Sequence, residues 1–417
     1  MTKQLGKYSF GLGDRFGRQG RAQLNAIIAA SERSVEINPV WNKSNREHNL
    51  TGTSPEDVRT EADTVTQEAG YDKPYFVDAD HININTVDKF IDSSDFFTID
   101  VAAYINKPAS DDSMRNFMEM TKKDSFQRAL NETITSSGFS SDQAAGTARK
   151  YLFAVEKASE IYKRIEQQKG TGNFITEISM DEVAEPQTPG ELLFICYMLA
   201  LAGIPAQTIA PRFPGKFNKG VDYTGDPIRF MEDFEKYLTI LDISAKEFGL
   251  PGNLKLSIHS GSDKFSLYPL IGSAIRRRNK GIHIKTAGTT WLEEITGLAE
   301  SGGEGLEFVK ELYNKALSRY DELCAPYSEV IDIQTDLLPG WKDVKVWTAS
   351  QFSEALKHVP GSRTLNPHLR QLMHVAYKIA AEQYNEFYRL LEANESTISA
   401  CVFGNIYDRH ISRIFGI

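Results

Sequence analysis

The chain has few cysteines for its length and no excess of positive charge. Its 417 residues include three cysteines, Cys196, Cys324 and Cys401, which are far apart and odd in number. They support neither a disulfide framework nor a cysteine-based metal site. The formal net charge of −9 argues against a nucleic-acid-binding surface and suits a protein that meets small metabolites. We therefore expect no nucleic-acid partner.

Long hydrophobic runs are also missing. The longest apolar stretch, LLFICYMLALAGI at 192–204, is too short for a bilayer span and is expected to form a buried helix. The first ten residues, MTKQLGKYSF, do not have the charged-then-apolar pattern of a signal peptide. These features favour a cytoplasmic protein without a membrane partner, and they leave open whether it forms a homo-oligomer.

What the sequence does contain is an alternation of short apolar segments with longer helical patterns. Strands are expected at 8–13, 74–80, 96–102, 173–179, 206–212, 254–260, 281–287 and 328–334. Helices are expected at 21–30, 55–69, 111–168 with a break near SSGFSSD, 189–202, 226–248, 266–279 and 291–322. This order favours an α/β fold of the parallel (β/α)8 TIM-barrel type.

The domain organisation follows from this barrel. Residues 1–417 are expected to form a single catalytic barrel domain, because no low-complexity linker interrupts the chain. Residues 103–172 are too long for one crossover and are expected to be a helical insertion that could cover the barrel mouth. Residues 349–417 are expected to form a C-terminal helical extension.

The segment YSFGLGDRFGRQG at 8–20 imitates a dinucleotide-binding loop. Its first three glycines have the spacing G-x-G-x-x-x-G instead of G-x-G-x-x-G, and Asp14 stands where a pyrophosphate would approach the backbone. The polar segment NPVWNKSNREHNLTGTSPED that follows is expected to be irregular, so that no second βαβ unit continues the pattern. We therefore expect a first barrel strand whose carboxyl end presents Asp14 and Arg15 to a substrate.

Polar residues alternate with apolar ones along several expected strands. Residues of a barrel strand that face the helices are apolar, so charged residues within strands need an explanation. Burying many ionisable groups is costly unless they pair with each other, with a metal or with a substrate. The groups concerned are Asp78, Asp80, His81, Glu177, Arg212, Lys255, His259, His283 and Lys285.

Three of these residues, His81, His259 and His283, fall at or near expected strand ends. Three protein ligands with an open position suit a catalytic zinc or a similar divalent ion. No local H-x-x-H spacing accompanies them, so each is also compatible with an ordinary interior histidine. The remaining histidines, including His374, are expected to have structural roles.

The carboxylates and cations have their own alternatives. Asp80 and Glu177 could supply an acid and a base on opposite sides of a bound sugar. They could instead form internal salt bridges to Lys255 or Lys285. Arg212 could grip a carboxylate or phosphate in bidentate fashion, or pair with an internal acid.

Five longer motifs stand out along the chain: SFGLGDRFG at 9–17, DADH at 78–81, KLSIHSGSDKFS at 255–266, HIKTAGTTWLEE at 283–294 and NIYDRHISRIFG at 405–416. With these motifs the chain resembles the tagaturonate epimerases, metal-dependent uronate epimerases of bacterial sugar catabolism. The resemblance spans nearly the whole chain and implies interconversion of D-tagaturonate and D-fructuronate, which differ at C4. It implies a divalent metal ion, namely zinc, manganese, cobalt or nickel, with His81, His259 and His283 as ligands. It makes Asp80 and Glu177 the acid/base candidates.

Chemistry limits the mechanism of such an epimerisation. C4 of a 2-keto sugar acid is β to the ketone, so its hydrogen is not acidified and direct deprotonation is unattractive. Retro-aldol cleavage of C3–C4 and migration of the carbonyl by proton transfers both stay open, and a Lewis-acid metal suits the first. Oxidation at C4 by a bound nicotinamide is disfavoured because the dinucleotide fingerprint is missing. An aldolase or ketose isomerase acting on another sugar or sugar acid, and a non-catalytic sugar-acid-binding barrel, are the alternative functions.

The carboxylate of a uronate would need a local cation beside Asp78, Asp80 and Glu177. Arg212 and Lys264 are the loop-level candidates for that contact. Lys255 and Lys285 lie deeper in their strands, where they are expected to serve the acids or an enediolate.

Overall fold

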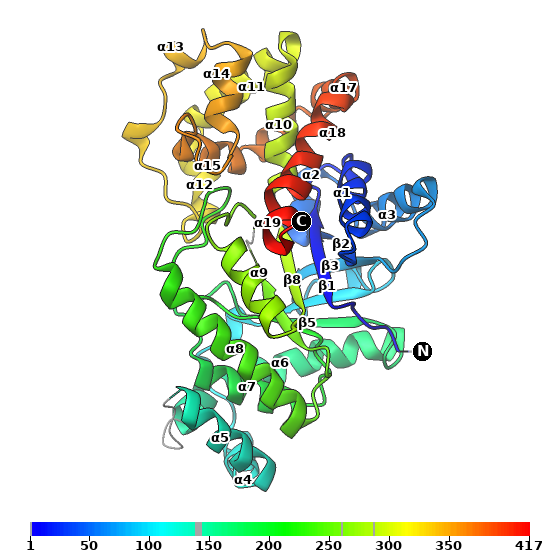
Figure 1. The fold of residues 1–417 in the computed structure, drawn as a ribbon, viewed down its shortest axis with the longest axis vertical. Helices are drawn as coiled ribbons and strands as arrows, with labels where there is room; N and C mark the ends of the chain where they lie inside the picture. The colour runs from blue at the N-terminus through cyan, green and yellow to red at the C-terminus, as the bar shows by residue number, and fades with distance from the viewer. Residues whose placement is uncertain (1, 138–143, 260–261, 287) are drawn as a thin grey trace.

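Eight parallel strands close into a barrel in the computed structural model, which describes residues 2–137, 144–259, 262–286 and 288–417. Each strand pairs with its sequence neighbours, and β8 pairs with β1 (Figure 1). The predicted (β/α)8 barrel is therefore confirmed. The strands are β1 (Tyr8–Gly13), β2 (Ile37–Ser44), β3 (Phe76–Ile82), β4 (Phe96–Asp100), β5 (Ile175–Ser179), β6 (Thr208–Ala210), β7 (Lys255–Ile258) and β8 (Ile282–Thr286).

One expected strand was wrong and one real strand was missed. The segment 37–44, expected to be irregular, is β2, so β1, α1 (Gly20–Glu32) and β2 form a true βαβ unit. Its Pro39 pairs with Phe10 of β1 but precedes Val40, where the pairing with β3 begins, so only one side of the strand has a partner at this position. The β-branched residues at 328–334 imitate a strand, but this largely exposed segment has no strand of its own.

Most expected helices are found with small changes of boundary, but two are divided. The stretch 111–168 also breaks at 121–123, and 291–322 is interrupted at Gly302 and Arg319. The break expected near SSGFSSD, and the last residues of two expected strands, Ser260 and Ala287, fall wholly or partly outside the described residues. Helix α7 is buried nearly all round, as its apolar sequence predicts, and none of the helices in the described ranges combines the length and hydropathy that a bilayer span requires. The helices that follow barrel strands include α3 (Pro55–Ala69), α7 (Pro189–Leu201), α8 (Pro227–Phe248), α9 (Tyr268–Arg277) and α10 (Thr289–Ser301).

The region 103–172 contains α4 (Asp111–Met120), α5 (Asp124–Ser137) and α6 (Ala144–Lys169). Helix α6 packs against β4 and α7 as a barrel helix does, whereas α4 packs on α6, and α5 packs on α7 and α8. In Figure 1, α4 and α5 lie at the bottom of the view, at the far end of the molecule from α13 (Trp341–Val344). The extra helices of this region thus sit on the outer helical layer and not over the barrel mouth.

The C-terminal additions begin earlier than residue 349. After α10, the chain forms α11 (Gly303–Ser318) and a series of shorter helices that includes α14 (Ala349–Leu356), α15 (Pro367–Val375) and α18 (Glu395–Gly404). Helix α10 packs against α11, α14, α15 and α18. One continuous cluster of buried apolar side chains joins these helices to the barrel helices, which supports the proposed single domain.

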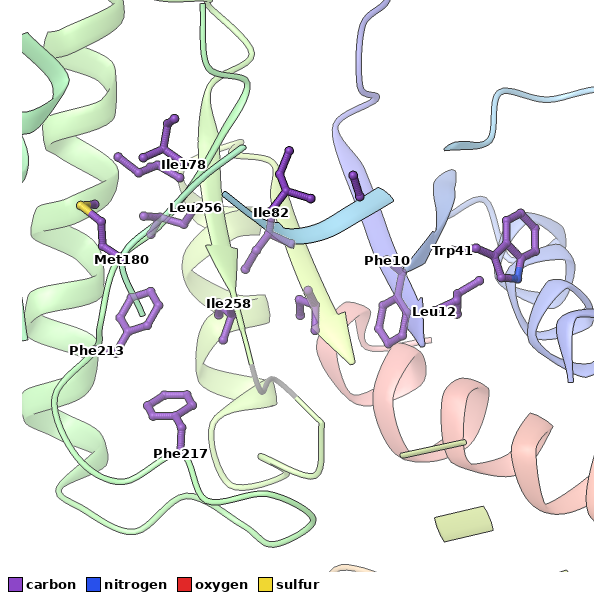
Figure 2. Close-up of a cluster of buried hydrophobic side chains, with 14 of the residues drawn as sticks. Phe10, Leu12, Trp41, Ile82, Ile178, Met180, Phe213, Phe217, Leu256 and Ile258 are labelled. Atoms are coloured by element: carbon purple, nitrogen blue, oxygen red, sulfur yellow. The ribbon is translucent and has the colours of Figure 1, made fainter. Parts of the chain in front are cut away.

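The barrel strands have two different faces. The outward faces carry apolar residues that pack against the helices, and Figure 2 shows several of them, among them Leu256 and Ile258 of β7. The inward faces carry four residues of a small apolar cluster, which Leu5 completes from the segment before β1. The four are Val40, Phe76, Phe96 and Ile175. Because Val40, Phe76 and Ile175 precede the polar inward-facing residues of their strands, this cluster closes the amino end of the barrel. The polar residues predicted from the alternation lie above it, toward the carboxyl ends.

Candidate active site

A lysine of β8 joins the acidic side chains inside the barrel. The Nζ atom of Lys285 lies 2.6 Å from Oδ2 of Asp78, 2.8 Å from Oδ1 of Asp80 and 3.4 Å from Oε1 of Glu177. It also donates a hydrogen bond to Oγ1 of Thr98 at 2.7 Å. All these side chains are buried, so the predicted internal salt bridges to Lys285 are present.

The charges in this cluster stabilise one another. Burial opposes the charge of Lys285, but Asp78, Asp80 and Glu177 outweigh burial and raise the pKa of that lysine. Burial would also raise the pKa of Asp80, but Lys285 and His81 hold it well below its usual range. Burial raises the pKa of Asp78 to about 6 against the opposing charge of Lys285. Lys285 is therefore a fixed ammonium ion that lets several carboxylates share the barrel interior.

Two histidines and an aspartate converge at the carboxyl ends of β3, β5 and β7. The ligand atoms that His81, Asp181 and His259 offer all lie within 4.8 Å of one another, so the three residues could hold a metal ion. Oδ1 of Asp181 lies 3.4 Å from Nε2 of His81 and 3.1 Å from Nδ1 of His259. Burial would raise the pKa of Asp181, but His259 and His81 outweigh burial and hold that pKa well below its usual range. The group therefore contains an anionic ligand between two imidazoles.

A bulge in β3 explains how Asp80 and His81, which are adjacent in sequence, both reach the interior. The pairing of β3 with β4 shifts between Ala79 and Ile82, where β3 has one more residue than its partner. His81 has a φ of 51°, in the left-handed region that non-glycine residues rarely adopt. Bulges and such backbone conformations concentrate at functional sites because they redirect a side chain. Here they turn His81 toward Asp181.

In both His81 and His259, the ring nitrogen that points away from Asp181 is hydrogen-bonded to a carboxylate. Asp80 accepts a hydrogen bond from Nδ1 of His81 at 2.7 Å, and Glu177 accepts one from Nε2 of His259 at 2.6 Å. Burial would lower the pKa of both histidines, but the surrounding carboxylates outweigh burial and raise these pKa values, so protons fill the gaps to Asp181 when no metal is bound. A divalent cation would replace those protons and bind the ring nitrogens that face Asp181, and carboxylate-held histidines are the usual arrangement around a protein-bound metal. The residues present thus fit a divalent metal ion.

The structure does not bring His283 into this group. His283 lies two residues before Lys285 on β8, and its Nδ1 is 2.9 Å from Oγ of Ser9 on β1. Its ring packs against Phe96 of the apolar cluster at 5.4 Å between centroids. Burial lowers its pKa to about 3, which keeps the imidazole neutral. Sequence alternation placed His283 on the inward face of β8. It could not show that His283 lies level with Ser257, one layer nearer the amino end of the barrel than His259.

A cavity of about 250 Å³ opens beside the His81 side of this group. Asp80 and His81 line it, whereas the fully buried Glu177 does not. His374 lines it as well, although no sequence pattern assigned that histidine a role at the site. The other lining residues are Arg15, Ser44, Asn45, Arg46, Glu47, Asn83, Thr86, Asp100, Glu182, Lys219 and Tyr327.

Asp14 serves the backbone of the loop after β1. Its carboxylate accepts hydrogen bonds from the backbone N–H groups of residues 16–19, at distances of 2.6 to 3.0 Å. Four such bonds fix the turn that leads into α1. Asp14 lines a different cavity from the one beside His81, so the structure gives its expected substrate contact no support.

Arg15 lines the cavity, but its donors are largely engaged. Its Nε lies 3.0 Å from Glu47, and its two terminal nitrogens bond to the backbone oxygen and to Nε2 of His374 at 2.7 and 3.1 Å. The guanidinium carbon stacks 3.8 Å from the centroid of the Tyr377 ring. Arg15 thus ties β1 to α2 (Asn45–Thr51) and to the C-terminal helices at the rim of the cavity.

Three other cations expected to bind substrate have protein partners. Lys255 lies at the amino end of β7, where its Nζ donates to the backbone oxygens of Gly6 and Lys7 and burial lowers its pKa to about 7. Lys264 is 1% exposed and donates to three backbone oxygens. Arg212 donates to the backbone oxygen of Asp181 at 3.3 Å. The backbone therefore engages Lys255 and Lys264, and Arg212 holds the segment that carries Asp181, a metal-ligand candidate.

Sequence reasoning missed several residues of this site, among them charged residues that follow or end barrel strands. Asp181 and Glu182 follow the end of β5 in SMDEVAE, and Asp100 ends β4. Acids just after strand ends were a usable signal for these three. Arg46 follows β2, whose polar carboxyl end was interpreted as irregular structure, so Arg46 was not expected at a strand end.

Comparisons with known proteins point to one family. The model of the tagaturonate epimerase (UxaE) family matches residues 1–414. The tagaturonate/fructuronate epimerase of Thermotoga maritima is 27% identical over 436 residues, which covers 98% of this chain and 81% of that protein.

Solved structures agree as well. A glycerol-bound crystal structure of the fructuronate-tagaturonate epimerase UxaE from Cohnella laeviribosi matches with a TM-score of 0.78 and 25% identity, over 100% of this chain and 82% of that one. A second glycerol complex of the same enzyme matches with a TM-score of 0.79 and 24% identity, over 99% and 83% of the two chains. Because the family model covers almost every residue, the chain belongs to the tagaturonate epimerase family.

Proposed function

We propose that this protein is a metal-dependent epimerase that interconverts D-tagaturonate and D-fructuronate by inverting C4. Family membership supports the reaction. The single structural observation that carries the proposal is the convergence of His81, Asp181 and His259 beside a cavity at the carboxyl ends of the barrel strands. Barrel enzymes build their active sites at this end.

His81, Asp181 and His259 would hold the metal ion. Two imidazoles and one carboxylate accept zinc, manganese, cobalt and nickel, so the donor set agrees with the sequence-based expectation without selecting one of these ions. When bound there, a divalent cation supplies Lewis acidity for polarising a substrate oxygen.

The carboxylates at the site divide into two roles. Glu177 is fully buried and contacts His259 and Lys285, so it acts as a positioning residue for the histidine. Asp80 contacts His81 and Lys285 but also lines the cavity, where a substrate hydroxyl can reach it. Asp100 lines the same cavity from the end of β4. We assign proton transfer at substrate hydroxyls to Asp80 and Asp100, and no longer to Glu177.

Incubation of the purified protein with tagaturonate, followed by NMR, tests the function directly. We expect fructuronate to accumulate to an equilibrium mixture, to stop forming after chelation, and to form again when a divalent ion is restored. Unchanged activity in protein shown to be metal-free would contradict the metal dependence. Accumulation of three-carbon fragments would identify an aldolase instead, because C3–C4 cleavage splits the six-carbon substrate in half.

A further inference from the structure

We propose that Arg46 binds the carboxylate of the hexuronate substrate, an inference that rests on the proposed function because it names the residue that recognises the acid group. A uronate brings a negative charge into a cavity lined by Asp80, Asp100 and Glu182. Like charges in one site repel, so a cation must lie within reach of the substrate carboxylate. The cations around the site can be compared by the partners that they already have.

Most of these cations are engaged by the protein. Lys285 is surrounded by three carboxylates, and Lys264 gives its ammonium hydrogens to three backbone oxygens. Arg15 is bound by Glu47 and by His374. Arg212 is not among the described residues that line the cavity. Lys219 also lines the cavity and has an interaction within the protein, so Arg46 is the lining cation that this comparison leaves among the described residues.

Arg46 has the geometry that a carboxylate needs. It lies in the first turn of α2, whose start is fixed by a capping box between Ser44 and Glu47. Its guanidinium carbon lies 4.8 Å from the centroid of the Tyr327 ring, and a cation over a ring face is held in orientation while its N–H groups stay directed outward. The neighbouring carboxylate of Glu47 is turned toward Arg15, at 3.0 Å. A planar guanidinium with two parallel N–H groups matches a carboxylate in bidentate fashion, whereas the ammonium of Lys219 acts as a point charge.

Tyr327 also connects this contact to the C-terminal helices. It belongs to η4 (Ala325–Tyr327), after α12 (Tyr320–Cys324), and its hydroxyl lies 2.9 Å from the hydroxyl of Tyr377 in α16 (Tyr377–Glu382). The ring that supports Arg46 is thus held from outside the barrel. The C-terminal additions complete the substrate site on this account, rather than only covering the barrel.

The test compares a charged and a neutral ligand in matched variants. In Arg46→Ala, we expect the affinity for fructuronate, measured by calorimetry, and kcat/KM for tagaturonate to fall by about 10- to 100-fold, the range of a charge-assisted hydrogen bond. Affinity for fructose, which has no carboxylate, should change less than about threefold, and metal content should be unchanged. Arg46→Lys should recover part of the loss, because it keeps the charge and loses the bidentate geometry.

Arg18→Ala is the matched control. Arg18 also stacks on a tyrosine ring, with its guanidinium carbon 4.7 Å from the centroid of Tyr388, but it lines a separate cavity. We expect this variant to bind fructuronate as the unaltered protein does. Tyr327→Ala should weaken fructuronate binding in the same direction as Arg46→Ala, because it removes the ring that orients the guanidinium.

The outcomes separate this inference from the proposed function. Turnover of tagaturonate by the unaltered protein decides the function, whatever Arg46 does. Equal losses for fructuronate and fructose in Arg46→Ala, or a selective loss in Lys219→Ala that exceeds the one in Arg46→Ala, would overturn the assignment of the carboxylate to Arg46.

Discussion

Nε2 of His259 donates a hydrogen bond to Oε1 of Glu177 over 2.6 Å, although the two residues are 82 positions apart in sequence. The bond fixes the imidazole so that its other nitrogen, Nδ1, faces Asp181 at 3.1 Å. Glu177 is at the same time 3.4 Å from Nζ of Lys285. Glu177, which was predicted to transfer protons with the substrate, therefore orients His259, a metal-ligand candidate. Removing its carboxylate should lower the affinity of the protein for metal.

Glu177→Gln should weaken metal binding by about 10- to 100-fold, the usual effect of removing the partner of a ligating histidine. Competition with a chelator of known affinity measures this change. Asp78→Asn is the control within the same charge cluster, since it removes a contact of Lys285 and leaves both histidine–carboxylate bonds in place. Equal metal affinity in Glu177→Gln and the unaltered protein would show that His259 does not depend on Glu177.

The structure and the sequence give different candidate ligand sets, which differ in whether Asp181 or His283 joins His81 and His259. The two sets make opposite predictions for the metal content of a His283 variant. Alanine replacements of His81 and His259 should each abolish stoichiometric metal, because each removes one of three ligands. His283→Gln should keep metal, because that histidine bonds Ser9 in a deeper layer. Elemental analysis of the purified variants decides between the two sets, with His368→Ala as a control outside the site. Metal loss in His283→Gln equal to that in the other two variants would restore the set expected from sequence.

The fold and the polar faces of its strands could be predicted because they depend on local patterns. Alternation in 254–260 and 281–287 identified the inward-facing residues of β7 and β8, and the structure confirms these faces. Depth along the barrel axis could not be predicted, because it depends on strand register, and this is why His283 was grouped with His259. The irregularity that turns His81 inward is also a matter of register between β3 and β4.

Contacts between distant segments were the least predictable part of the site. Arg46 and Tyr327 are 281 positions apart (327 − 46). Arg46 follows β2, which was expected to be irregular, and Tyr327 directly precedes 328–334, which was wrongly expected to be a strand. The segment 37–44 was rejected as a strand for its polarity, yet those polar residues are its carboxyl end, where a barrel places functional groups. Polarity at a strand end was therefore a signal of function that resembled a signal of irregular structure.

A buried ion pair behind the β7 loop should contribute strongly to stability. Nη2 of Arg370 in α15 lies 2.7 Å from Oδ2 of Asp263, and neither side chain is exposed. Arg370→Met would leave Asp263 without its main cation, so the free energy of unfolding should fall by about 3–5 kcal/mol in chemical denaturation. Lys216→Met breaks the exposed pair with Asp332 and should change it by less than ~0.5 kcal/mol. Similar values for the two variants would mean that solvent or other groups compensate the charge of Asp263.

The carboxylate of Glu61 in α3 should make stability depend on pH. Burial, with the nearby charge of Asp14, raises its pKa to about 8 from an ordinary value of 4.5. Between these values the folded protein binds more protons at this group than the unfolded chain does, so the contribution of Glu61 to stability falls as the pH rises from about 4.5 to about 8.

Glu61→Gln isolates this contribution, because the amide stays neutral and its oxygen can still accept the hydrogen bond from the N–H of Gly20. At pH 8 the variant should be more stable than the unaltered protein by about 1–2 kcal/mol, and near pH 4.5 the difference should vanish. Thermal or chemical unfolding at both pH values measures the two differences, and Glu36→Gln, an exposed carboxylate with a lowered pKa, is the control that should show no such gain. A Glu61→Gln variant that is less stable at pH 8 would show that Glu61 is ionised in the folded protein and stabilised there by Lys43 or Arg18, the cations on which its pKa depends.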